Sequence, residues 1–339
     1  PLDLDRMSGR LGVRFSPDGA RVDGRGLELL TRESTATNDD AQHIHVGPTD
    51  FHVDWQNLKN SDAVRGSARA SVLDLAPLRK LAAHLPLDAG SRKWLSDLAP
   101  RGRLADLRVN WQGNIEKLQK YALKSRFDEL SINASGHFPG ASSISGSIDA
   151  DEHGGNINVL GRKASIELPA VFTESSIPFD TLRAEAKWKI AKEQLDVELS
   201  RVEFANPEAA GTAQGSYRLG GTGPGRIDLT ANLVRADARA VWRYLPRVIN
   251  ADARQWVRNA LKAGTASEAK LVLKGDLANF PFSDHKNGQF LVTVKAHDVT
   301  LDYGPGWPFI TGIDADLRFE GTGMVVQASK GAIFGAKLS

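Results

Sequence analysis

One pattern of residues occurs twice in this chain, and the two copies lie about half the chain length apart. Each copy places a tryptophan 8 residues before a glycine and a second glycine 11 residues further on. The first copy consists of Leu85, Pro86, Trp94, Gly102 and Gly113, and the second consists of Leu245, Pro246, Trp256, Gly264 and Gly275. A pattern repeated at this distance predicts a repeat protein with two similar units, at about 1–176 and 177–339.

Most of the chain is predicted to form strands with one apolar and one polar face, because apolar and polar residues alternate with a period of two. Turn sequences rich in glycine and proline separate the alternating runs. Clear runs occupy 184–190, 195–199, 227–233, 290–296 and 313–319. Short turns between successive strands favour antiparallel pairing. We therefore expect a mainly β fold.

Helical periodicity occurs in two places, once in each copy of the repeat. Asp74 is suited to cap a first pair of helices near 75–98, with Pro77 in the first turn. In a second pair, near 237–262, the first helix is predicted to start near Asp237 and the second near Asn250. Gly264 is expected to end the second of these helices. We expect Trp94 and Trp256 to pack these helices onto the sheet.

The composition excludes several classes of function. Lys and Arg (43) nearly balance Asp and Glu (41), so no strong overall charge would attract nucleic acid. The absence of cysteine excludes disulfides, thiolate nucleophiles and thiolate metal sites. No segment is long and apolar enough to cross a bilayer. Because the chain starts at Pro1 and ends within a strand-like pattern at 337–339, we expect it to be a segment of a longer protein.

No catalytic or metal-binding motif stands out in the sequence. His43 and His45 would lie on one face of a strand, but no third ligand has a suitable spacing, so we expect no metal site there. Residues 151–153 (Asp-Glu-His) are expected to form a solvated turn. The sequence therefore predicts a protein that is not an enzyme and that has no cofactor.

Four arginines recur at every fourth position, at Arg235, Arg239, Arg243 and Arg247. On a helix this spacing would gather the cations on one side. Two interpretations are open: a solvated helix face, or contact with anionic lipid headgroups or an acidic partner.

The second half of the chain carries motifs that resemble a known family. They are Tyr244-Leu245-Pro246, Gln255-Trp256-Val257, Gly264, 275–282 (GDLANFPF), 288–290 (GQF) and 301–308 (LDYGPGWP). This set is similar to the AsmA-like family of Gram-negative envelope lipid-transport proteins, most densely over 232–335. The first half resembles the family more loosely.

The resemblance implies a fold and a function. The fold is an elongated, strongly twisted antiparallel sheet that curls into an open apolar groove, a repeating β-groove. Such proteins are held in the inner membrane by an N-terminal helix, extend through the periplasm and are implied to carry phospholipid between the inner and outer membranes. The resemblance brings no catalytic residues with it.

Alternation in the second half supplies candidate side chains for such a groove. They are Leu195, Val197, Leu199, Ile227, Leu229, Leu233, Leu271, Leu273, Val292, Val294, Leu317 and Phe319. We expect glycerophospholipids as the cargo and envelope proteins as further partners, in the periplasm. The same alternation would also build a closed β core, so a structural or adaptor protein of the envelope is the alternative.

Overall fold

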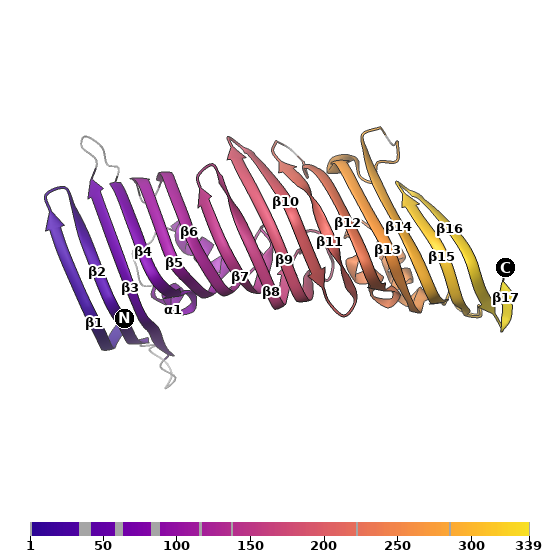
Figure 1. Cartoon of the computed structure of the whole chain (residues 1–339), viewed down its shortest axis with the longest axis horizontal. Coiled ribbons are helices and arrows are strands. Elements are labelled where there is room, and N and C mark those ends of the chain that lie inside the picture. Colours follow the sequence, from indigo (N-terminus) through magenta and orange to yellow (C-terminus); the bar gives the residue numbers. More distant parts are fainter. Residues whose placement is uncertain are drawn as a thin grey trace. The chain divides into compact units, whose positions relative to one another are not determined.

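The computed structural model describes residues 2–33, 42–57, 64–82, 89–114, 117–136, 138–221, 223–284 and 286–338. Strands dominate these residues, and the α-helices occur in two places in the chain (Figure 1). The predicted mainly β, antiparallel fold with two short helix pairs is confirmed. The chain divides into two compact units, Pro1–Val159 (unit 1) and Leu160–Ser339 (unit 2), within strand β8 (Gly154–Glu167). The repeat boundary at 176–177 remains a prediction from the sequence.

Unit 1 is an antiparallel meander in which each strand from β1 to β7 pairs with the next. Figure 1 shows these strands side by side in chain order. Helix α1 packs against β3, β4 and β5. The elements are β1 (Leu2–Ser16), β2 (Gly19–Glu33), β3 (Gln42–Asn57), β4 (Val64–Asp74), α1 (Leu75–Ala82), α2 (Ala89–Leu98), β5 (Arg101–Asn114), β6 (Lys117–Ile132) and β7 (Gly140–Asp151).

Unit 2 follows the same plan, with successive pairing from β9 to β17. The 3-10 helix η1 packs against β12, β13 and α3. Among the described pairings, none closes either meander into a barrel. The elements are β9 (Ser176–Ala191), β10 (Gln194–Ala205), β11 (Ala209–Leu219), β12 (Arg226–Asp237), η1 (Ala238–Tyr244), α3 (Ala251–Ala260), β13 (Leu261–Asp276), η2 (Leu277–Asn279), β14 (Gly288–Leu301), β15 (Ile310–Glu320), β16 (Gly323–Ile333) and β17 (Ala336–Leu338).

The repeated glycines perform the same backbone task in both units. Gly102 and Gly264 have φ values of 104° and 121°. A Cβ on Gly102 would lie 2.5 Å from the carbonyl oxygen of Glu129, and a Cβ on Gly264 would lie 2.6 Å from Val299 Cγ2. Both positions therefore require glycine for conformation and for space.

β-bulges recur at matching positions as well. Asp106 and Glu268, 162 positions apart, have φ values of 52° and 50°, and each lies at a register shift. Glu129 and Asp298, 169 positions apart, have φ values of 49° and 50° and also lie at register shifts. A bulge bends a strand and increases its twist. The bends of the sheet are thus part of the repeat.

The predicted helix caps are present. Asp74 Oδ1 accepts a hydrogen bond from the Ala76 N–H at 3.2 Å, and Asp237 Oδ1 accepts one from Arg239 N–H at 2.9 Å. Asn250 Oδ1 accepts from Asp252 N–H at 2.6 Å. The prediction that the last helix is closed by Gly264 is wrong. It ends at Ala260, because β13 starts at the next residue and pairs with β14.

The two tryptophans do not lock the helices onto the sheet as predicted. Trp94 is 58% exposed and Trp256 is 46% exposed. Trp256 instead donates a hydrogen bond from Nε1 to the carbonyl oxygen of Tyr303 at 3.1 Å, and so contacts the segment after β14. Leu85 and Pro86 of the first copy lie outside the described residues.

Candidate functional site

The register of unit 2 gathers the predicted groove side chains on one face. Directly paired residues of antiparallel strands project to the same side of a sheet. One row crosses β10 to β14 through Leu199, Gly215, Leu229, Leu273 and Phe290.

A second row, two residues along the strands, crosses β12 to β16 through Ala231, Leu271, Val292, Phe319 and Met324. The remaining predicted residues share this side by the same pairing or by the two-residue period within their strands. We call this side of β9–β16 the apolar face of unit 2. All twelve predicted side chains lie on it: Leu195, Val197, Leu199, Ile227, Leu229, Leu233, Leu271, Leu273, Val292, Val294, Leu317 and Phe319.

The twelve predicted side chains of the apolar face are half-buried. The buried residues on it are the small Ala269, Ala296 and Ala315, together with Leu182 on β9 and Val299 on β14. The twelve predicted side chains belong neither to the buried core nor to the strongly exposed residues. A closed core would bury such leucines, valines and phenylalanines almost completely. Among the described residues of unit 2, these twelve side chains are thus partly covered by neighbouring residues and partly exposed to solvent.

The opposite face of the same strands is charged. Lys274 pairs with Asp228 directly across β12 and β13, and Arg218 pairs with Asp196 across β10 and β11. The hydrogen bond from Arg218 is the main cause that lowers the pKa of Asp196. These pairs are solvent-exposed, so their contribution is to keep this face in water and to favour the register. Each strand therefore separates an apolar side from an aqueous one.

Unit 1 has an equivalent face, which the site prediction from sequence left out. A row of aliphatic residues crosses β1 to β5 through Val13, Val22, Val53, Ala68 and Val109. The repeat could have predicted this face from the sequence, because Val109 corresponds to Leu271, which lies 162 residues later in the second copy.

An aromatic row lies beside the aliphatic one, with Trp55, Gly66, Trp111 and Tyr121 paired in succession. A Cβ on Gly66 would lie 2.1 Å from the Trp111 ring, so this ring covers the strand at the glycine. The aromatic ring thus takes the place of a side chain at Gly66.

The four arginines of the second helical region do not form one helix face, contrary to the expectation from their spacing. Only Arg239 and Arg243 lie in η1, which is a seven-residue 3-10 helix. Arg235 lies two residues before the end of β12 and donates to the carbonyl oxygens of Asn206 and Pro207, while Arg247 donates to that of Pro169. Their contact with lipid headgroups remains a prediction.

Arg239 and Arg243 differ in their surroundings. Arg239 is exposed and bonded to Asp237, and the hydrogen bond with Asp237 raises its pKa. Arg243 is less exposed and binds two carboxylates, Glu174 and Glu208. Arg239 is therefore the better candidate for an external anion.

The expected solvated turn at 151–153 is present. Asp151 Oδ1 accepts hydrogen bonds from the N–H groups of His153 (2.8 Å) and Gly154 (3.0 Å). Glu152 accepts from the Tyr121 N–H, and this bond is the main cause that lowers its pKa. The three side chains could bring ligand atoms within 4.8 Å of one another, but these turn contacts account for both carboxylates.

The two histidines of the H-x-H pattern offer no assembled metal site in the described part of the chain. His45 Nε2 lies 2.8 Å from Glu28 Oε1, and this hydrogen bond lowers the pKa of Glu28. The side chain of His43 lies outside the described residues.

Within the ranges that the structure describes, no helix is long and apolar enough to cross a membrane.

Comparison with known proteins places the chain in a family. The family model of the YhdP protein matches residues 1–339. The chain belongs to the YhdP family. The Intermembrane phospholipid transporter YhdP of Escherichia coli (strain K12) is 25% identical to this YhdP-family chain over 301 residues. That alignment covers 85% of the chain and 22% of the E. coli protein, so the chain spans about a fifth of its relative. No solved structure gives a significant match. The AsmA-like resemblance is confirmed.

Proposed function

We propose that this chain is a periplasmic section of a conduit that shields phospholipid acyl chains between the inner and outer membranes. The conduit would be held in the inner membrane by an anchor elsewhere in the protein. The observation that carries the proposal is the apolar face of unit 2, whose twelve predicted lining side chains are half-buried while the opposite face is charged. The name of the E. coli relative, an intermembrane phospholipid transporter, supports phospholipid as the cargo.

The chemistry of the apolar face suits an acyl chain. A methylene group gains about 0.8 kcal/mol when it leaves water for an apolar surface. Leu229, Leu271 and Leu273 offer aliphatic contacts of similar strength along neighbouring strands. A lipid tail that slides over such a surface exchanges one contact for another and meets no deep trap. The process needs no bond-breaking step, so the proposed function is non-enzymatic.

The fold keeps headgroups apart from tails. The backbone of β12 and β13 separates Leu229 and Leu273 on one side from Asp228 and Lys274 on the other. Ionised groups placed among acyl chains would lose their hydration at a high cost. Acyl chains would therefore lie on the apolar face with their headgroups directed to water at its rim.

Photo-crosslinking tests the proposal, because adjacent residues of one strand face opposite sides. Benzoylphenylalanine would replace Leu271 or its neighbour Val272 in β13, and Leu229 or Thr230 in β12. We expect lipid adducts by mass spectrometry at 271 and 229 and little at 272 and 230, in protein purified from a Gram-negative host. Absence of lipid at all four positions, or equal labelling of both faces, would contradict a lipid path on the apolar face.

A matched pair of charge substitutions adds a functional test. Leu271→Asp should remove co-purifying phospholipid in native mass spectrometry, while Val272→Asp should retain it. A folded Leu271→Asp variant that still carries lipid would argue against the conduit. If wild-type protein emerges free of lipid under conditions that preserve other lipid complexes, the adaptor alternative gains support.

A further inference from the structure

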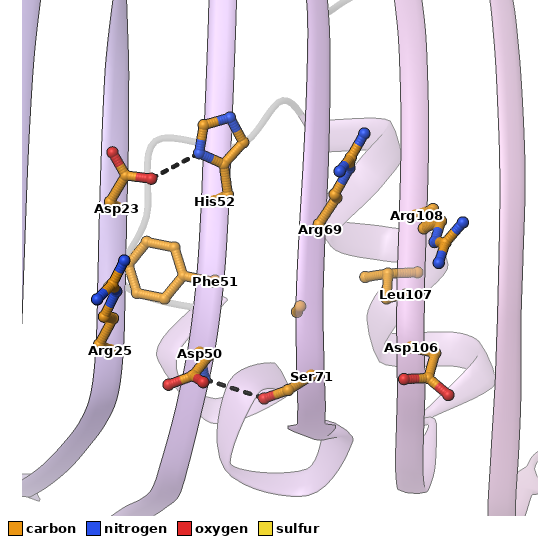
Figure 2. A pocket seen from close by; sticks show the side chains of 12 residues that line it. Asp23, Arg25, Asp50, Phe51, His52, Arg69, Ser71, Asp106, Leu107 and Arg108 are labelled. Carbon is orange, nitrogen blue, oxygen red and sulfur yellow. Dashed lines mark hydrogen bonds and ion pairs between the residues drawn. The ribbon is translucent and has the colours of Figure 1, made fainter.

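The polar face of unit 1 carries a cavity in which two arginines, Arg69 and Arg108, lack partners among the described residues. The cavity has a volume of about 370 Å³ and lies over β2, β3, β4 and β5 (Figure 2). It is on the polar side, because Asp23, His52, Arg69 and Arg108 are paired in succession one residue away from the aliphatic row of Val22 to Val109. It is therefore on the opposite side of the sheet of unit 1 from this aliphatic row.

Two arginines oppose each other directly in this cavity. Arg69 of β4 pairs in register with Arg108 of β5. Cβ atoms of directly opposed residues are about 4.5–5.5 Å apart, and like charges in this position are destabilising. Figure 2 shows the two side chains on neighbouring strands. Among the described residues, neither guanidinium has a hydrogen bond or an ion pair.

The carboxylates that line the cavity are already engaged. Asp23 Oδ1 is 2.7 Å from His52 Nδ1, and Asp50 Oδ1 accepts from the Gly26 N–H at 2.7 Å. Asp106 is bonded to Arg126. None of these acids forms an ion pair with Arg69 or Arg108 in the described part of unit 1, so both guanidinium groups keep their donors available.

A further donor points to an oxyanion. The Ser71 hydroxyl accepts a hydrogen bond from the Asp50 N–H at 3.0 Å, which leaves its own proton able to donate. Guanidinium groups bind phosphate oxygens in a two-pronged geometry and keep their charge at any physiological pH. The cavity is large compared with the roughly 30 Å³ that one water molecule occupies. The two guanidinium groups and the Ser71 hydroxyl are thus the donors that this cavity offers to a phosphate ester.

The repeat provides an internal comparison. Lys270 in β13 occupies the position of Arg108, 162 residues on, and its directly paired neighbours are Asn232 and Thr293. The sheet of unit 2 therefore forms with one cation at the position where unit 1 has two opposed arginines. The arginine pair of unit 1 is not a requirement of the fold.

We propose that the cavity on the polar face of unit 1 binds a phosphate group through Arg69, Arg108 and Ser71. The phosphate is either free in solution or part of a lipid headgroup, and both supply the same oxyanion. This proposal does not rest on the proposed conduit, since it is argued from the polar face of unit 1 and the conduit is argued from the apolar face of unit 2.

The test compares thermal unfolding of the 339-residue chain in sodium phosphate and in sodium chloride at equal ionic strength. We expect phosphate to raise the Tm by about 1–2 °C. Arg69→Gln should abolish this increase, and it should raise the Tm in chloride because the opposed charges are relieved. Arg69→Lys should weaken the phosphate response without that gain. Lys270→Gln, the matched control in unit 2, should leave the phosphate response unchanged.

Vesicle flotation distinguishes the sources of the phosphate. The probes are vesicles of phosphatidylcholine alone and of phosphatidylcholine with phosphatidylglycerol. Recruitment to the second kind that is lost in Arg69→Gln/Arg108→Gln would assign a lipid headgroup, whereas a Tm response without recruitment would assign a free phosphate. The proposal is overturned if neither assay responds, if the variants respond as wild type does, or if sodium glutamate raises the Tm as much as phosphate.

Discussion

The hydroxyl of Tyr244 donates a hydrogen bond to Glu208 Oε2 at 2.8 Å and thereby joins the end of η1 to the turn before β11. The same hydroxyl accepts a hydrogen bond from Asn206 Nδ2 at 3.0 Å. Asn206 is buried, and its Oδ1 accepts from the N–H groups of Glu208 and Ala209. Arg243 completes the cluster through Glu174 and Glu208. The helical region is therefore attached to β9–β11 by side-chain hydrogen bonds as well as by packing.

Tyr244→Phe should lower the free energy of unfolding of the chain by about 1–2 kcal/mol, because Asn206 and Glu208 each lose a partner at a partly buried site. Urea unfolding followed by circular dichroism measures the loss. Tyr217→Phe is the control, since that hydroxyl donates to Pro224 at an exposed turn. Equal losses in the two variants would mean that the Tyr244 cluster adds no stability of its own.

The same tyrosine predicts a loss of stability in alkali. Burial is the main cause that raises the Tyr244 pKa from 10.0 to about 12. Between these values the unfolded chain has released the phenolic proton and the folded chain retains it, so the stabilisation is complete below pH 10 and is lost as the pH rises toward 12. Wild-type protein should lose more stability than Tyr244→Phe between about pH 9 and about pH 11 in urea titrations. Parallel losses would contradict the raised pKa.

Local features of the fold could be predicted from the sequence. Asp74 and Asn250 precede apolar helical segments, and a cap depends on atoms two or three residues away. Gly102 and Gly264 are recognisable because the repeat places them at the same point twice. The alternation within each strand was sufficient to assign Leu271 and Leu273 to one side.

Features that depend on distant partners could not be predicted. The spacing of Arg235 to Arg247 suggested that these cations share one side of a helix, but η1 holds only two of them and Arg243 bonds to Glu174, 69 residues away. The opposition of Arg69 and Arg108 depends on the register of β4 and β5, across the two helices between them. Bulges such as that at Asp106, which shifts the register between β5 and β6, have no clear signature in one sequence.

The repeated glycines predict matched effects in both units. Gly102→Ala and Gly264→Ala should each cost of order 1–3 kcal/mol, because the backbone is left-handed and the new methyl group meets Glu129 or Val299. Gly12→Ala is the control, since its nearest contact would be 3.9 Å away and its φ is ordinary. Urea unfolding of the three variants measures the costs. A similar cost in all three would show that loss of glycine alone, and not the left-handed backbone, explains the effect.

Arg239 provides the test of headgroup contact by the helical region. It is exposed, and its single bonded partner among the described residues is Asp237, whereas Arg243 is held by two glutamates inside the cluster. If η1 contacts an anionic bilayer, Arg239→Gln should lose about 1 kcal/mol of binding, roughly a fivefold weaker association with vesicles that contain phosphatidylglycerol. The loss should shrink at high salt, because exposed charges are screened. Arg218→Gln removes a similarly exposed, acid-paired cation from the polar face of β11 and should leave vesicle binding unchanged. If Arg239→Gln and Arg218→Gln bind as wild type does, the arginines of this region form a solvated surface and the headgroups of the cargo are contacted elsewhere.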